Sequence, residues 1–425
     1  MRWEYFHDGT SSNPFHLYFT ENYFPSNKIS IALSNTDMIN LIDETYREQY
    51  INDVRWSNKY FQDTKINGLS TYLIENKKTI SDVYGKIKGL EELGNVLTIL
   101  CEEKILTAYV GATEYTDASG NVNVVKSTDP IGYIRPHSEK YGTFLKESIL
   151  NTGKYIYFYD IYNGIFIRKS YNGMYPISGK IDVPEGSYDY KMRSYFKELS
   201  DSLIDSLYNG SVSSAVTEDV KCYTGYDPYH NHIYVTFKDK VTAANNVTLI
   251  FDENINKWFC KYTSYVSGAS STIYPFTKNS LFSHYLYSLY ELNRDDVDRC
   301  YLYGEQQDSY IEFVSHDYPN LVKIFNAISI HTDDQWTVEY IEIEANDSYP
   351  NGMYTEIKDS EFIKEEGVYK SEIFKNMKTR SSTASNWDRY NGEDMRGYVV
   401  KVKLSNSNTS KTELFKVDLM EEFSR

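Results

Sequence analysis

The sequence contains few cysteines. Four cysteines occur among 425 residues, and no two of them lie within three positions of each other, which excludes a Cys-x-x-Cys metal or redox motif. So few thiols argue against a disulfide scaffold. We expect reduced, mostly buried cysteines, as suits a protein that folds in a cytoplasm.

Long hydrophobic runs are also absent. No stretch of about 18 consecutive apolar residues occurs, and no apolar segment follows Met1. We therefore expect neither a membrane span nor a signal peptide.

Positive charge is scarce relative to negative charge. The chain has 44 Lys and Arg against 60 Asp and Glu, which gives a net charge of -16. A surface that grips nucleic acid needs clustered basic side chains to release counterions, so this balance argues against tight DNA binding. It is compatible with an acidic wall past which DNA slides, because such a wall repels phosphate.

The common enzyme signatures are missing. The chain has no Gly-x-Ser-x-Gly elbow, no Walker loop, no Gly-x-Gly-x-x-Gly turn and no His-Glu-x-x-His motif. The sequence does not exclude a pair of carboxylates of the kind that hydrolyses glycosides, because the distance between the two groups is set by the fold. From the residues we predict no catalytic, cofactor-binding or metal-ligating side chain, and no cofactor.

Three polar clusters could hold a cation by residue type alone. Two histidines fall on one face of an expected strand, without a third ligand nearby, and an acidic run lacks the Gly and Glu of a calcium loop. We interpret these as solvated histidines, a solvated loop and an acidic strand face. The clusters are His230 and His232; Asp295, Asp296 and Asp298; and Glu339, Glu342 and Glu344.

Tyrosine is the residue present in excess. The chain has 42 tyrosines, and aromatic residues make up 16% of it, whereas prolines number only 10. Tyrosine favours strands and keeps a polar tip for water or a partner. This composition, with many Asn and Ser, is typical of β-hairpins with polar turns and of surfaces that contact other proteins.

Three hairpin patterns recur. In each, an aromatic or apolar run ends near an aspartate, an asparagine follows, and a second apolar run begins. The Asp side chain accepts bonds from nearby backbone N–H groups, and Asn or Gly tolerates left-handed φ. Their recurrence suggests degenerate blades of a repeat. The turn residues are Asp160, Asn163 and Gly164; Asp227, Pro228 and Asn231; and Asp252, Asn254 and Asn256.

Other segments carry helix or strand patterns. Tyr195, Leu199 and Leu203 recur every four residues, which predicts a helix over about 187–208 that Gly210 ends. A second helix is a candidate at 278–292, and a short helix or turn at 89–93. We expect buried strands over 96–103 and 104–110, strands from 310 onward, and a C-terminal hairpin over 396–422 in which Val400, Val402 and Leu404 alternate with lysines.

The order of these motifs resembles the propeller-bearing tail proteins of crAss-like phages, the muzzle or stabilization proteins, which are akin to tail hub or nozzle proteins of other short-tailed phages. The similarity spans roughly residues 60–425. The segments that carry it are 157–178, 192–196, 225–237, 248–265, 310–330 and 391–404.

The resemblance implies a mainly β fold: a degenerate β-propeller-like core of hairpins, one or two inserted helices and a C-terminal sandwich-like layer. It also implies a virion protein, assembled in the host cytoplasm, that forms a distal tail ring of six subunits. DNA and cargo proteins would pass through this ring, and other hub, tube and fibre proteins would contact it. Hub proteins of this kind have no catalytic residues to carry over.

We expect three parts: an irregular interface arm at 1–60, a propeller-like domain at 61–300 and a β-rich portion at 301–425. The ragged aromatic start suggests a further N-terminal part that is either missing or cleaved off. Two alternatives stay open, a receptor- or glycan-binding tail protein and a glycan-degrading propeller enzyme. Exposed aromatics around a concave pocket would indicate the former, and a carboxylate pair in a central funnel the latter.

Overall fold

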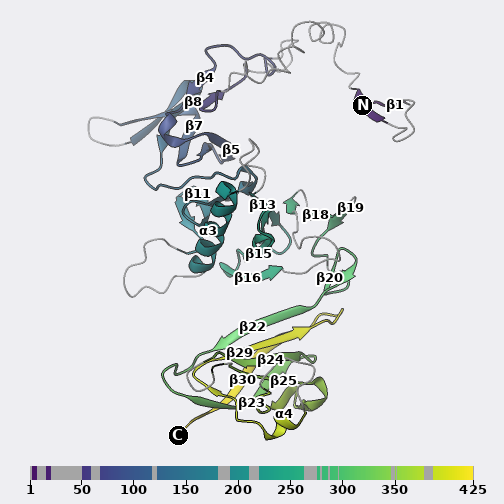
Figure 1. The fold of residues 1–425 in the computed structure, drawn as a ribbon. Coiled ribbons are helices and arrows are strands. Elements are labelled where there is room, and N and C mark those ends of the chain that lie inside the picture. The colour runs from purple at the N-terminus through teal and green to yellow at the C-terminus, as the bar shows by residue number, and fades with distance from the viewer. Residues whose placement is uncertain are drawn as a thin grey trace.

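The structure is a computed structural model, and it is built mainly of antiparallel strands, which confirms the expected fold class (Figure 1). Two α-helices occur in the described residues, α3 (Arg193–Asn209) and α4 (Asn386–Asn391). The described residues are 2–6, 16–20, 50–58, 68–116, 122–179, 192–209, 220–262, 275–277, 280–285, 288–294, 296–345, 350, 352–377 and 386–424.

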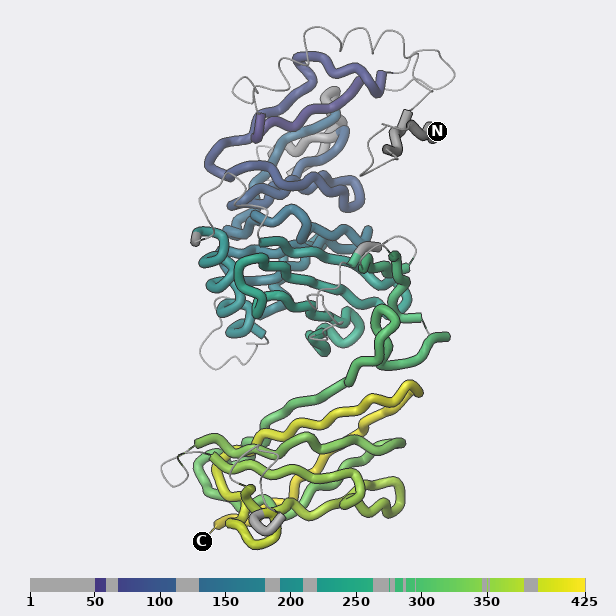
Figure 2. Tube along the Cα trace, turned by 45° about the vertical axis from the view of Figure 1, so that its right-hand side comes forward, coloured from purple at the N-terminus to yellow at the C-terminus, as the bar shows by residue number. Residues whose placement is uncertain are grey.

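Three four-stranded meanders follow one another along the chain, and a three-stranded one comes after them (Figures 1 and 2). In each sheet, neighbours in space are neighbours in sequence. The strands are β5 (Ile87–Leu93), β6 (Val96–Cys101), β7 (Ile105–Thr116) and β8 (Val122–Pro136); β9 (Leu150–Asn151), β10 (Ile156–Asp160), β11 (Ile165–Ser170) and β12 (Gly173–Pro176); β13 (Val220–Asp227), β14 (His232–Asp239), β15 (Val247–Asp252) and β16 (Lys257–Tyr262); then β17 (Pro275–Thr277), β18 (Leu281–Tyr285) and β19 (Ser288–Glu291).

Small ladders and turns complete this part of the chain. They are β1 (Arg2–Phe6) with β2 (His16–Thr20), β3 (Asp53–Arg55) with β4 (Lys77–Thr79), β20 (Tyr301–Leu302) with β21 (Glu305–Gln306), and 3-10 turns at Asp82–Tyr84, Lys146–Ser148 and Ala243–Asn245.

The meanders stack face to face because successive side chains of a strand point to opposite faces. In β10, Ile156 and Phe158 join a core with β5–β7, whereas Tyr157 and Tyr159 join a second core with β13–β15. On the far side of the third sheet, Tyr234 packs with residues of β15 and β18. The central strands are therefore buried on both faces, which explains why their sequences are continuous apolar runs.

Helix α3 covers the core between the second and third sheets. Its side chains at Phe196, Leu199, Leu203 and Leu207 are all buried. The spacing of three to four residues places them on one face of the helix. The predicted helix is confirmed from Arg193 onward, and its expected start at 187–191 and its stop at Gly210 lie outside the described residues.

The three predicted hairpins are present as β10–β11, β13–β14 and β15–β16. In each turn the aspartate Oδ1 accepts a backbone N–H. The bonds run from Asn163 to Asp160 (3.0 Å), from Tyr229 to Asp227 (3.0 Å) and from Asn254 to Asp252 (2.7 Å). Gly164, Asn231 and Asn256 have φ of 60°, 62° and 54°, so the left-handed positions fall where Gly and Asn were expected.

A β-sandwich forms the C-terminal part of the chain, in green to yellow in Figure 2. One sheet has the order β22-β29-β24-β25, and the other has β26-β27-β23 with β28 and β30 paired to β23. Both sheets contribute to one core. The strands are β22 (Ser309–Ser315), β23 (Lys323–Thr332), β24 (Thr337–Ile343), β25 (Met353–Ile357), β26 (Ile363–Glu365), β27 (Val368–Glu372), β28 (Arg396–Gly397), β29 (Val400–Asn406) and β30 (Leu414–Phe423), with a 3-10 turn at Asp359–Glu361.

Several local predictions are wrong. Residues 89–93 belong to β5, and residues 278–292 contain β18 and β19 instead of a helix. The expected C-terminal hairpin does not form, because β29 pairs with β22 and β24 while β30 pairs with β23 of the other sheet. The described meanders stack like blades, but they do not close into a propeller.

One ion pair on the sandwich gives a prediction about pH. Glu312 of β22 accepts from Lys401 Nζ at 2.8 Å and from Tyr340 OH at 2.6 Å, and these bonds lower the pKa of its carboxyl, that from Lys401 most. The stabilisation is therefore present above the unfolded pKa of about 4.3 and is lost as pH falls through the lower folded pKa.

In the variant Lys401→Met we expect the pKa of Glu312 to rise toward about 4.3. Carbon NMR of selectively labelled glutamate measures this pKa directly. Lys403→Met is the matched control, because Lys403 of the same strand pairs with Glu339 and should move Glu312 less. Identical Glu312 titrations in the wild type and Lys401→Met would contradict the assignment.

Candidate functional site

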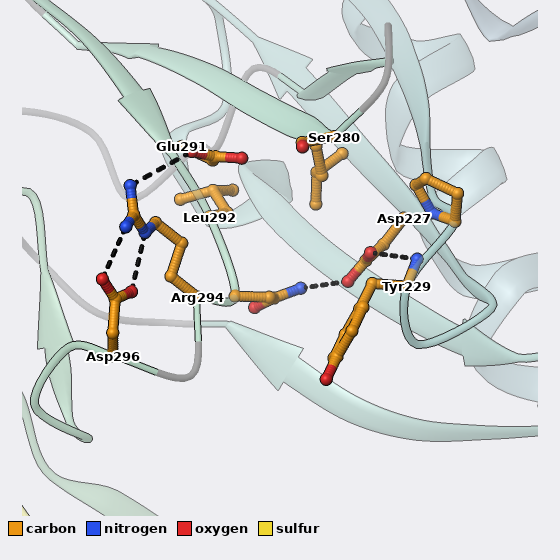
Figure 3. Close-up of a pocket in the computed structure, with 10 residues that line it drawn as sticks. Asp227, Tyr229, Ser280, Glu291, Leu292, Arg294 and Asp296 are labelled. Atoms are coloured by element: carbon orange, nitrogen blue, oxygen red, sulfur yellow. Dashed lines mark hydrogen bonds and ion pairs between the residues drawn. The ribbon is translucent and has the colours of Figure 1, made fainter.

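A pocket of about 520 Å³ lies between the β13–β14 turn and the hairpin β18–β19. Figure 3 shows Asp227 and Tyr229 on one side of it and Arg294 with Asp296 on the other. Leu281 adds an apolar side chain to its wall. The pocket exists because the third meander packs against the last hairpin, while the chain then leaves toward the sandwich.

Asp227 is the buried charge of this pocket, with 3% of its surface exposed. Its Oδ1 accepts the backbone N–H of Tyr229, and its Oδ2 accepts from His230 Nδ1 (2.8 Å) and Asn293 Nδ2 (2.7 Å). The same amide of Asn293 also donates to Tyr234 OH at 2.6 Å. This carboxylate is therefore occupied in holding the turn and the hairpin together.

Arg294 supplies the positive charge at the pocket mouth. It donates to Asp296 through Nε (2.7 Å) and Nη2 (2.5 Å), and Nη1 lies 3.5 Å from Glu291 (Figure 3). The bond from Arg294 lowers the pKa of Asp296, which keeps this exposed carboxyl ionised. Sequence reasoning placed Asp296 in a solvated loop and missed Asn293 and Arg294. The sequence feature that could have identified these two residues is the polar run directly after an apolar strand.

The two predicted histidines do lie side by side. Their rings stack with centroids 5.5 Å apart, and each faces a carboxylate: His230 pairs with Asp227, and His232 Nε2 lies 3.6 Å from Asp252 Oδ2. Burial is the main cause that lowers the pKa of His232. Across the described ranges, no group of three or more His, Cys, Asp or Glu side chains is placed to hold a metal ion.

The acidic clusters are dispersed. Asp295 lies outside the described residues, Asp296 pairs with Arg294, and Asp298 is exposed. On β24, Glu339 pairs with Lys403 of β29 at 2.5 Å, so one side of the predicted acidic strand face is neutralised by its neighbour.

Proton-transfer chemistry needs a carboxyl with a raised pKa near a cavity. Within the described part of the chain, burial raises the pKa of Asp160, but this side chain bonds Asn163 and the backbone N–H of Gly142 in a turn. All four cysteines are free, and burial raises the pKa of Cys101 to about 12, so its thiol stays protonated at neutral pH. The pocket carboxylates Asp227 and Asp296 serve as hydrogen-bond acceptors.

Neither described helix is long and apolar enough to cross a membrane. Residues 297–376 match the family model of the Crassvirus muzzle protein C-terminal domain. The match includes β20 to β27, and the strands β28–β30 that complete the sandwich come after it. No curated protein matches the chain.

Proposed function

We propose that this chain is a muzzle protein of the crAss-like phage type, a structural component of the virion, and that it forms part of the distal ring of the phage tail. DNA and cargo proteins would leave through this ring. The observation that carries the proposal is the match of residues 297–376 to the muzzle C-terminal domain.

The ring would contain six copies of the chain, next to other hub, tube and fibre proteins. Exposed aromatic side chains suit such contacts, since ring closure covers faces that a lone subunit leaves open. Tyr72, Tyr171 and Tyr318 are 60%, 69% and 65% exposed. Six copies at -16 each would give the ring a charge of about -100. This negative charge repels the phosphates of DNA, so DNA would pass through the ring without adhering to it.

The proposal includes a non-catalytic role. It is supported by the pocket, where Asp227 is saturated by hydrogen bonds and Asp296 is held by Arg294. It also includes the division into an arm at 1–60, stacked sheets at 61–300 and a sandwich at 301–425. This division is supported by hydrophobic clusters whose members fall either before 300 or after it.

Mass measurement tests the ring. We expect light scattering of the full-length chain to give the mass of a closed ring, about six times the monomer mass of 49.6 kDa or twice that where two rings associate, with a central hole in electron-microscope class averages. A monodisperse 49.6 kDa species at every concentration, together with binding on a glycan array, would overturn the proposal in favour of a receptor-binding protein.

A further inference from the structure

Among the strands of the described residues, β22 stands at the edge of its sheet and pairs with β29 alone. Five of its seven residues are exposed, including Tyr310 (44%), Ile311 (40%) and Val314 (50%). The strand has no proline, no lysine and no bulge in its pairing with β29. These are the devices by which proteins keep an edge strand from pairing with another chain.

The other edges of the sandwich are protected. At β25, Asn376 accepts from the backbone N–H of Tyr354 (3.1 Å), Met377 donates to its carbonyl (2.7 Å), and Arg389 donates to the carbonyl of Glu356 (2.8 Å). Strand β30 carries Lys416 and Asp418 and has two register shifts against β23. Strand β26 has only three residues. Strand β22 has one such device, the charge of Glu312, and lacks the others.

The sequence of β22 is nearly palindromic. Ser309–Ser315 reads Ser-Tyr-Ile-Glu-Phe-Val-Ser, with Glu312 at its centre. An antiparallel partner of the same sequence, centred on Glu312, places serine opposite serine and apolar opposite apolar. The facing pairs are Ser309 with Ser315, Tyr310 with Val314, and Ile311 with Phe313.

The central pair would bring two carboxylates together, which destabilises a ladder unless the charge is compensated. Each Glu312 carries its own compensation, since Lys401 Nζ lies 2.8 Å away and Tyr340 OH donates to it at 2.6 Å. Two Glu–Lys pairs at the centre of the contact are neutral overall. The charge pattern and the apolar pattern of β22 are therefore both self-complementary.

We propose that β22 pairs with β22 of a second copy of this chain, antiparallel and centred on Glu312, so that two sandwiches share one continuous eight-stranded sheet. Such a contact is two-fold and uses the same surface on both chains. A cyclic ring is closed by contacts between unlike surfaces and has no such two-fold axis, so this contact joins copies that belong to two different rings or that are not yet part of a ring. Pairing with the second copy would cover the exposed side chains of Tyr310, Ile311 and Val314.

Engineered cysteines test the register in the full-length chain. The background is Cys300→Ser, because Cys300 Sγ lies 3.3 Å from Ser309 Oγ. Directly opposed residues have Cα atoms about 4.5–5.5 Å apart, within disulfide range. We expect Glu312→Cys to form a disulfide-linked dimer on a non-reducing gel. A mixture of Ser309→Cys and Ser315→Cys chains should give a mixed dimer, whereas each alone should not, because like positions lie about 20 Å apart.

The cysteine at Ile363→Cys is the matched control, since this side chain is 66% exposed on β26 of the same sandwich. Dimer yields for Glu312→Cys and for the Ser309–Ser315 mixture that do not exceed this control would overturn the pairing. The Ser309–Ser315 mixture retains Glu312, so it remains informative if Glu312→Cys loosens the strand. Ile311→Lys added to the mixture should reduce its cross-linking at least tenfold. The gel reads this contact alone, so its result is independent of whether a ring forms.

Discussion

Replacing Phe196 with alanine is expected to lower the free energy of unfolding by about 3–5 kcal/mol. Phe196 is 0% exposed and lies at the centre of the core between the second and third sheets. Its ring is 5.0 Å from that of Trp258 and about 6 Å from those of Tyr159 and Phe237. Truncation removes contacts between the helix and both sheets at once and leaves a cavity in the core.

Urea unfolding gives the size of this loss, and hydrogen exchange read by mass spectrometry gives its place. Amides of β10, β11 and β14 should exchange faster, while those of β23 and β24 should keep their wild-type rates because a separate cluster forms their core. Tyr208→Ala, an aromatic truncation on the same helix at a side chain 69% exposed, should cost under about 1 kcal/mol. Equal losses in the two variants would contradict this account.

The second large effect is expected from Arg389→Ala, which should destabilise the sandwich by about 3–5 kcal/mol. Arg389 is 2% exposed, ion-paired to Glu361 and bonded to the carbonyl of Glu356. Its guanidinium carbon lies 4.2 Å above the ring of Phe374. Removal leaves the half-buried Glu361 without its partner and uncovers the edge of β25.

Arg389→Lys should recover only part of this loss, because an ammonium lacks the planar fork that bonds a carboxylate and a carbonyl together. Lys411→Ala breaks an exposed pair with Glu413 and should cost about 0–1 kcal/mol. Denaturant unfolding with hydrogen exchange of β24 and β25 distinguishes these outcomes. If those amides keep their wild-type protection from hydrogen exchange in Arg389→Ala, the prediction is wrong.

Much of the fold could be predicted from local turn chemistry. Asp160, Asp227 and Asp252 each end a strand and accept N–H groups of the following turn, as their spacing to Asn indicated. A fourth such turn was readable but missed: Asp239 ends β14 and accepts from Val241 (2.8 Å) and Thr242 (3.0 Å).

Pairing between distant segments could not be predicted in the same way. Val400, Val402 and Leu404 alternate inward as expected, but the polar turn after them does not return β30 to β29. Both edges of β29 are already taken by β22 and β24, whose sequences lie far away. Residues 89–93 read as helical because Leu and Glu favour helices, yet β5 pairs along β6, where tertiary context outweighs propensity.

The pocket illustrates a similar limit. The rings of His230 and His232 lie side by side as the sequence indicated, but His230 lies in the β13–β14 turn and only His232 lies on β14. The link of His230 to Asn293 through Asp227 joins residues more than sixty positions apart. Such a network depends on how the last hairpin docks on the third sheet. The local pattern at 293–298 contains no information about that docking.

The interior meanders are packed against a neighbour on both faces, and this arrangement affects how cooperatively the sheets unfold. Among the described sheets, β9–β12 packs against the sheet before it and the sheet after it, so free energy is coupled between neighbouring sheets, as in a one-dimensional array. An interior sheet cannot melt without exposing two interfaces, whereas a terminal sheet exposes one. Opening should therefore propagate inward from the three-stranded sheet β17–β19, next to which the chain leaves for the sandwich.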